Sequence, residues 1–188
     1  QEEALAVAIQ RDGKIVVAGY TGIDAPPPLK DPPPTFAMAR YHADGSLDTS
    51  FGTGGRVSGS VNGIARAIVI QPDGKIVLAG DFEVELPNNL FVSDFQLARF
   101  NPDGSLDLGF GITGSGQVLT DIGGGAFNTA SNVVLQPDGA IVLSGQANCG
   151  AGAGCDHTDV VRYLAGGTLD ASFGDGGKLT LAEIQPAK

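Results

Sequence analysis

The sequence predicts an all-β protein, and three features indicate this fold class. Glycine and proline account for 29 and 11 of the 188 residues, which suits many short strands joined by tight turns. An apolar run leads into each of the recurring Asp-Gly pairs and a second apolar run leaves it, a pattern typical of β-hairpins. No stretch has the sustained 3.6-residue periodicity of an amphipathic helix. The apolar fraction of 42% lies in the globular range, so we expect these strands to surround a core.

The strands are organised by a motif that occurs three times. Ile-Gln-Pro-Asp-Gly-Lys-Ile-Val-Leu-Ala-Gly at 70–80 recurs almost unchanged at 9–19 and at 135–145. Each copy predicts a hairpin, because Asp and Gly tolerate the positive φ of a tight turn. A recurrence at roughly sixty residues indicates a tandem array. The repeats are predicted to cover approximately residues 1–62, 63–127 and 128–188.

Each repeat contains four predicted strands in the same order. The first strand alternates, ends in glutamine, and is expected at 4–10, 65–71 and 130–136. The second leaves the Asp-Gly turn through Ile-Val-x-x-Gly. The third ends in arginine and is expected at 36–40, 95–99 and 158–162. A second turn module, at 43–52, 102–111 and 165–174, leads to a short fourth strand that begins near Gly55, Gly116 and Gly177.

Four antiparallel strands in each tandem unit are typical of a β-propeller blade. The motifs Gln-Pro-Asp-Gly-Lys-Ile-Val, Leu-Ala-Arg-Phe-Asn-Pro-Asp-Gly-Ser-Leu-Asp and Ser-Phe-Gly resemble the delta-60 repeat family. That family occurs in tandem in large, mostly secreted bacterial proteins and is thought to form β-propellers. The resemblance covers nearly the whole chain. It implies the architecture and a secreted or cell-surface bacterial location, and it brings no general activity or catalytic set.

Three blades are fewer than the four to eight that normally close a propeller. The exposed sheet faces and edges of a partial propeller need cover. The chain can be part of a longer array, copies can join head to tail in a ring, or units can stack in an open filament. The predicted partners are therefore other protein chains, either further repeats or copies of this chain.

The charge balance argues against one class of partner. The net charge is −10, from 21 acidic and 11 basic residues, and the basic residues are scattered. Nucleic acid is therefore not an expected partner, because phosphate binding needs clustered Lys and Arg. No apolar run is long enough to span a membrane. The 188 residues contain no segment with the basic start and apolar core of a signal peptide, and such a segment is removed during secretion.

The two cysteines, Cys149 and Cys155, lie on either side of Gly-Ala-Gly-Ala-Gly. This linker is flexible enough for the sulfurs to meet, so a disulfide is predicted, and it would indicate an oxidising compartment. Free thiols are one alternative. Metal ligation together with His157 is another, although zinc sites usually have closer spacings and more ligands.

Two turns carry oxygen atoms in a pattern that suits a hard cation. Aspartate, serine and aspartate occupy the first, third and fifth positions of Asp-Gly-Ser-Leu-Asp, an arrangement that calcium can use. The candidate ligands are Asp44, Ser46 and Asp48 in the first copy and Asp103, Ser105 and Asp107 in the second. The third copy has Gly166 in place of the first acid, and turns capped by Asp and Ser explain all three copies equally well.

Three residue types recur at one register and admit a structural or a ligand-binding interpretation. Arg40, Arg99 and Arg162 are expected to pair with Asp48, Asp107 and Asp170, since a half-buried arginine favours a bidentate carboxylate. The alternative is that the arginines line a central channel and bind a ligand. Phe51, Phe110 and Phe173 are expected to fill the core between blades.

The sequence contains no recognisable catalytic motif and no cofactor motif in a suitable context. Gly109–Gly114 matches a dinucleotide fingerprint but lies in a turn with no helix predicted after it. No Gly-x-Ser-x-Gly or His-Glu-x-x-His motif occurs, and His42 and His157 are not equivalent in the repeats.

The predicted function is a secreted, non-catalytic structural or interaction module. Its variable loops, at 20–35, 81–94 and 146–157, would make surface, matrix or filament contacts. The alternative is an extracellular carbohydrate-binding or polysaccharide-acting propeller enzyme. The absence of tryptophan for stacking on sugars, and of an assignable pair of carboxylates, argues against that alternative.

Overall fold

A computed structural model describes residues 2–22, 33–86, 90–122, 128–147 and 157–181. These residues form three four-stranded antiparallel sheets and no helix. The first sheet contains β1 (Glu2–Ile9), β2 (Ile15–Thr21), β3 (Thr35–Tyr41) and β4 (Arg56–Val57). The second contains β5 (Ile64–Ile70), β6 (Ile76–Leu86), β7 (Leu90–Phe100) and β8 (Gln117–Thr120). The third contains β9 (Thr129–Leu135), β10 (Ile141–Ala147), β11 (His157–Tyr163) and β12 (Lys178–Leu181).

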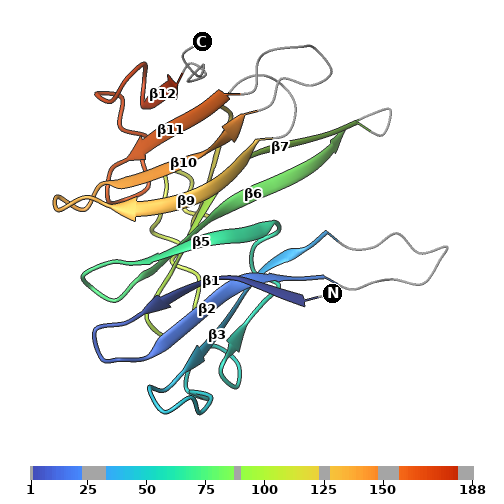
Figure 1. Ribbon diagram of the computed structural model, residues 1–188, viewed down its shortest axis with the longest axis vertical. Helices are drawn as coiled ribbons and strands as arrows, with labels where there is room; N and C mark the ends of the chain where they lie inside the picture. The colour runs from blue at the N-terminus through green and yellow to red at the C-terminus, as the bar shows by residue number, and fades with distance from the viewer. Residues whose placement is uncertain (1, 23–32, 87–89, 123–127, 148–156, 182–188) are drawn as a thin grey trace, which may run out of the picture.

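The strands of each sheet follow one another in chain order, and the sheets pack face to face. The first sheet lies at the bottom of Figure 1 (blue), the second in the middle (green) and the third at the top (orange). The first strands of the sheets, β1, β5 and β9, pack against one another at the inner edge of the array. This is the blade arrangement of a β-propeller, as predicted, and the described sheets do not close into a ring.

The repeated Asp-Gly turn is explained by its backbone. Gly74 has φ +86°, a conformation that side chains rarely adopt. The carboxylate of Asp73 accepts a hydrogen bond from the amide of Lys75 (3.1 Å) and so fixes the turn. The Asp-Gly pair therefore determines the register of β5 against β6.

The glycine that ends the repeated motif has a separate role. The β5–β6 register shifts between Ala65 and Ala67, which is a β-bulge. A Cβ at Gly80 would overlap the carbonyl oxygen of Ile64 beside this bulge. The same overlap occurs at the corresponding glycines of the other sheets, so any larger residue there would displace the first strand.

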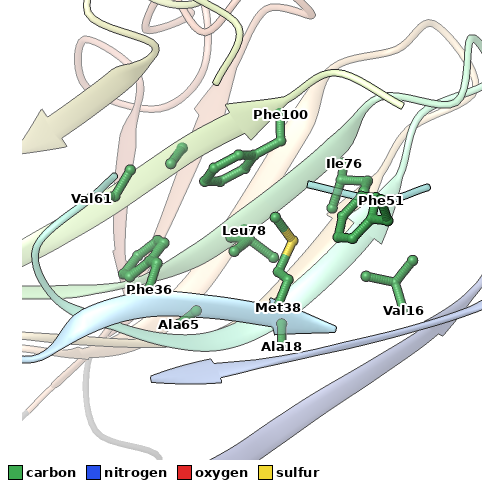
Figure 2. Close-up of a cluster of buried hydrophobic side chains, with 11 residues drawn as sticks. Val16, Ala18, Phe36, Met38, Phe51, Val61, Ala65, Ile76, Leu78 and Phe100 are labelled. Carbon is green, nitrogen blue, oxygen red and sulfur yellow. The ribbon is translucent and has the colours of Figure 1, made fainter. Parts of the chain in front are cut away.

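The second sheet is buried on both faces. Ile76 and Leu78 belong to a core shared with the first sheet, and Val77 and Ala79 belong to one shared with the third. Figure 2 shows the first core, where side chains from the two sheets meet. Because successive residues at the start of β6 face opposite cores, residues 76–80 are a continuous apolar run rather than an alternating one.

One predicted loop is wrong. Residues 81–94 were expected to form a loop between the second and third strands, but β6 continues to Leu86 and β7 begins at Leu90. The segment is rich in Phe, Val and Leu, which favour extended pairing over an irregular connection. The second sheet therefore extends as a long hairpin beyond its neighbours.

Candidate functional site

Each sheet carries an arginine, an aspartate and a phenylalanine close together, and in the first two sheets this group contacts the next sheet. In the first sheet, Nε of Arg40 donates to Oδ2 of Asp48 (2.8 Å) and Nη1 donates to the carbonyl oxygen of Pro102 in the second sheet (2.6 Å). The guanidinium lies 4.5 Å from the centre of the Phe51 ring, within cation–π range. We call this unit the arginine clasp, comprising Arg40, Asp48 and Phe51 and its counterparts Arg99, Asp107 and Phe110, and Arg162, Asp170 and Phe173.

The second clasp repeats this geometry. Nε of Arg99 donates to Asp107 (2.7 Å), Nη1 donates to the carbonyl oxygen of Ala165 in the third sheet (2.8 Å), and the Phe110 ring centre is 4.6 Å away. Phe51 and Phe110 are fully buried. The predicted pairing of arginine with aspartate is confirmed, as is the predicted placement of these two phenylalanines between blades.

The third clasp differs because the structure describes no sheet beyond it. Arg162 still donates to Asp170 (2.7 Å), with the Phe173 ring at 4.7 Å. Among the described residues, however, nothing accepts a hydrogen bond from Nη1 of Arg162, and Phe173 is only half-buried. The exposed fraction of the arginine side chain rises from 7% and 11% in the first two clasps to 24%. The predicted burial of Phe173 between blades is thus only partial.

At the opposite end of the array, the first sheet has exposed apolar side chains on its outer face. We call the face of each sheet that is directed toward the next sheet its trailing face, and the other its leading face. On the leading face of the first sheet, Val7 and Ile9 are 63% and 71% exposed. Their counterparts pack against the two cores, Ile68 and Ile70 against the first and Val133 and Leu135 against the second. The leading face of the first sheet is therefore a core surface without a covering sheet among the described residues.

A hollow of about 400 Å³ lies over this leading face. Small side chains line it, including Val17, Ala37 and Ala39, together with Tyr41. The residues that correspond to Val17 and Ala39 in the second sheet, Leu78 and Ala98, are fully buried against the first sheet. The hollow is thus the socket that is filled at each internal junction.

The repeats match a known family in three segments, residues 10–51, 71–110 and 136–173. The family model is described as Domain of unknown function (DUF5122) beta-propeller. The chain belongs to this family. No curated protein matches the chain. Each DUF5122 segment begins at the glutamine after the first strand and ends at the clasp phenylalanine, so it contains the Asp-Gly turn, the second and third strands and the clasp residues.

The DUF5122 repeats contain two clasp lysines that the sequence analysis missed. Nζ of Lys14 lies 3.1 Å from Oδ2 of Asp48, and Nζ of Lys75 lies 2.9 Å from Oδ2 of Asp107. Each lysine follows an Asp-Gly turn. The third repeat has Ala140 at this position. The recurrence of lysine at this position in two copies is the signal that could have predicted the ion pairs. It was interpreted only as part of the turn.

The clasp aspartates ionise more readily than free aspartate. Hydrogen bonds from the Ser50 hydroxyl and from Lys14 hold the pKa of Asp48 far below its ordinary value of 3.8. Burial opposes ionisation of Asp107, but hydrogen bonds from Lys75 and the Gly109 amide outweigh it and lower that pKa too. All of these carboxylates are therefore charged at neutral pH.

The DUF5122 array should consequently lose stability in acid. A carboxyl group with a lowered pKa in the folded state stabilises the protein above the unfolded value of 3.8, and this stabilisation is lost as pH falls toward the folded value. We expect the urea midpoint to be constant from pH 7 to 5 and to drop below about pH 4. Asp48→Asn should lower the midpoint at pH 7 and flatten this decline. An equally steep decline in the variant would contradict the assignment to Asp48.

The predicted calcium ligands lie in two separate turns, where other groups of the protein already bind their carboxylate oxygens. Oδ1 of Asp44 accepts hydrogen bonds from the amide and hydroxyl of Ser46, at 2.9 and 2.6 Å. Asp103 and Ser105 form the same pair of bonds, at 2.9 and 2.7 Å. Asp48 and Asp107 are each neutralised by an arginine and a lysine. A calcium ion would have to compete with these cations for the carboxylates.

Melting temperatures can test whether either turn binds calcium. Because the carboxylates are already paired, we expect millimolar calcium or a chelator to leave the melting temperature unchanged. A rise with calcium that disappears in Asp103→Asn would instead establish a cation site in the second turn. Asp175→Asn, outside both turns, is the matched control.

The remaining chemical candidates do not assemble into a site. His42 and His157 lie on different sheets, near Asp48 (3.8 Å) and Asp159 (3.1 Å) respectively. In the described part of the chain no three His, Cys, Asp or Glu residues group together as metal ligands, and no helix could span a membrane. Cys149 and Cys155 lie outside the described residues, as do most of the first and third variable loops.

A polar hollow of about 490 Å³ lies between the hairpin ends of the first two DUF5122 blades. Its lining includes Asp12, Lys14, Arg40, Asp73 and Asp103. Arg40 and Lys14 both pair with Asp48, so these two cations are already neutralised by a protein carboxylate. The hollow can accept a small polar molecule, but no aromatic side chain is among its lining residues.

Proposed function

We propose that this DUF5122 β-propeller array is a non-catalytic interaction module, which binds other protein chains through the end faces of its sheets. The observation that carries the proposal is the apolar leading face of the first sheet, with Val7 and Ile9 exposed. Burying these two side chains would contribute about 4 kcal/mol. An apolar protein surface is the partner that gains this energy, whereas a polar small molecule would not.

The proposed place of action is outside the cell, on a bacterial surface or among secreted proteins. The resemblance of residues 97–107 to delta-60 repeats supports this, because that family occurs mostly in secreted bacterial proteins. A disulfide between Cys149 and Cys155 would suit the same oxidising compartment. In this proposal the variable loops add contacts around those made by the sheet faces.

A photo-crosslinking amino acid at position 7 tests the interaction function in cells that produce the protein. We expect a covalent adduct with a protein chain. The same substitution at Ile112 is the control, because Ile112 is 85% exposed but lies in a turn of the second blade, away from both end faces. Adducts of equal yield at both positions, or none at position 7, would contradict the proposal.

Carbohydrate binding is a second candidate, favoured by the polar hollow at the hairpin ends. A glycan array, followed by a turnover assay with any polysaccharide that binds, distinguishes the two functions. Binding that is lost in Asp73→Ala, together with no protein adduct at position 7, would favour the carbohydrate function. Absence of glycan binding would exclude the carbohydrate function, and protein binding would be the remaining candidate.

A further inference from the structure

The two junctions between neighbouring sheets share a ring, a glycine and two hydrogen bonds, and the second junction adds a bond from the Gln71 side-chain amide to the carbonyl oxygen of Ala165 (3.4 Å). The clasp phenylalanine of one sheet packs on a glycine of the next: a Cβ at Gly104 would lie 3.0 Å from the Phe51 ring, and one at Gly167 would lie 2.6 Å from the Phe110 ring. The residue after each phenylalanine donates its amide across the junction. Gly52 donates to the carbonyl oxygen of Asp103 (2.7 Å).

The second junction uses the same hydrogen bonds. Gly111 donates its amide to the carbonyl oxygen of Gly166 (2.8 Å). The clasp arginine donates Nη1 to the preceding carbonyl, that of Pro102 at the first junction and of Ala165 at the second. Each junction thus combines one ring, one guanidinium and one amide from a trailing face with one glycine and two carbonyls from a leading face.

The first sheet carries the leading half of such a junction without a partner. Gly45 corresponds to Gly104 and Gly167, but a Cβ there would meet no atom within 4 Å among the described residues. The carbonyl oxygens of Ala43 and Asp44 correspond to those that accept the two hydrogen bonds. In the described part of the chain these two oxygens accept none.

The third sheet carries the trailing half. Phe173 is half-buried, and neither Nη1 of Arg162 nor the amide of Gly174 donates to any described residue. Around them Val160 is half-buried and Leu179 is 41% exposed. Within the described residues, the two free donors of the third sheet, Nη1 of Arg162 and the amide of Gly174, therefore match in number and order the two free carbonyl oxygens of the first sheet.

We propose that a second copy of this chain occupies both faces, so that two copies close head to tail into one six-bladed ring. The proposal rests on the interaction function and names its partner. Propellers normally close with four to eight blades, and six is the only multiple of three in that range. In the ring, Phe173 of each copy packs over Gly45 of the other, Arg162 donates to Ala43, and Gly174 donates to Asp44.

The new junction is less apolar than the internal ones. Ser144 and Thr158 stand on the trailing face of the third sheet, where the first sheet has Ala18 and Phe36. Less apolar area is buried by this pair, so the ring should dissociate on dilution while each three-bladed chain stays folded.

Native mass spectrometry and light scattering of the 188-residue chain test the proposal. At high concentration we expect a discrete species of twice the 19.0 kDa chain mass, which converts to the single chain on dilution. Ile9→Asp on the leading face and Phe173→Ala on the trailing face should each raise the dissociation constant about tenfold or more. Ile112→Asp changes a similarly exposed side chain away from both faces and should leave the constant unchanged.

Mixing the two variants tests the head-to-tail arrangement. Ile9→Asp and Phe173→Ala chains retain one intact face each, so the mixture should form a mixed pair through one native junction although neither variant pairs well alone. A pair joined through identical faces would not show this complementation, and its absence would overturn the arrangement. Circular dichroism of each variant verifies that the chain is folded.

Other masses overturn the proposal. A ladder of trimers and larger species would show an open filament rather than a closed pair. A single chain at every concentration would show that the faces take another occupant, such as further blades or an unrelated protein. In that case an adduct at position 7 with a different protein would still support the interaction function, so the two proposals fail separately.

Discussion

Replacing Phe110 by alanine is expected to lower the free energy of unfolding by about 4 kcal/mol. The ring is fully buried between the second and third sheets, it packs on Gly167, and it lies beneath the Arg99 guanidinium. The substitution removes apolar contacts and leaves a cavity that the two sheets cannot close without moving together. Urea unfolding, followed by circular dichroism of the strands, measures the loss.

The chain itself supplies a matched control for this change. Phe173 occupies the same register and has the same arginine above it, but it is only half-buried. Phe173→Ala should therefore cost about 1 kcal/mol at concentrations where the chain is single. Equal losses in the two variants would show that the phenylalanine stabilises its own turn rather than the junction between sheets.

The fold was largely predictable because each repeat contains its own local signals. Asp-Gly turns, alternating strands and the Arg–Asp spacing all depend on residues close in sequence, and their threefold repetition separated structure from chance. The pairing of Arg99 with Asp107 could be predicted for this reason. The same repetition explains why Gly109–Gly114 is a turn and not a nucleotide loop.

The features that were missed depend on contacts between distant segments. The β6–β7 extension through residues 81–94 depends on pairing of two strands whose apolar residues have no equivalent in the other repeats. The Lys75–Asp107 ion pair crosses between two turns. The contrast between buried Gly104 and exposed Gly45 arises only from position in the array, since both have the same local sequence. Sequence therefore identified the repeat but not which copy remains uncovered.

Replacing Arg99 by methionine is expected to cost about 3 kcal/mol of unfolding free energy. Methionine keeps most of the apolar stem over Phe110, so the change removes mainly the charge and the hydrogen bonds. The carbonyl of Ala165 loses its shorter hydrogen bond, at 2.8 Å, and keeps only the one from the Gln71 side-chain amide, at 3.4 Å. Half-buried Asp107 keeps only Lys75 as its cation. Urea unfolding at pH 7 measures the cost.

Arg162→Met separates the two roles of the clasp. Arg162 makes the same bond to its aspartate, at 2.7 Å, but donates to no carbonyl of a following sheet in the described part of the chain. If the clasp acts mainly by tying one blade to the next, this variant should lose only a fraction of the stability lost in Arg99→Met. Equal losses would mean that the clasp orders its own turn, and the bond across the junction would then contribute nothing measurable. A smaller loss for Arg162→Met that grows at concentrations where chains pair would assign the missing carbonyl to the second copy.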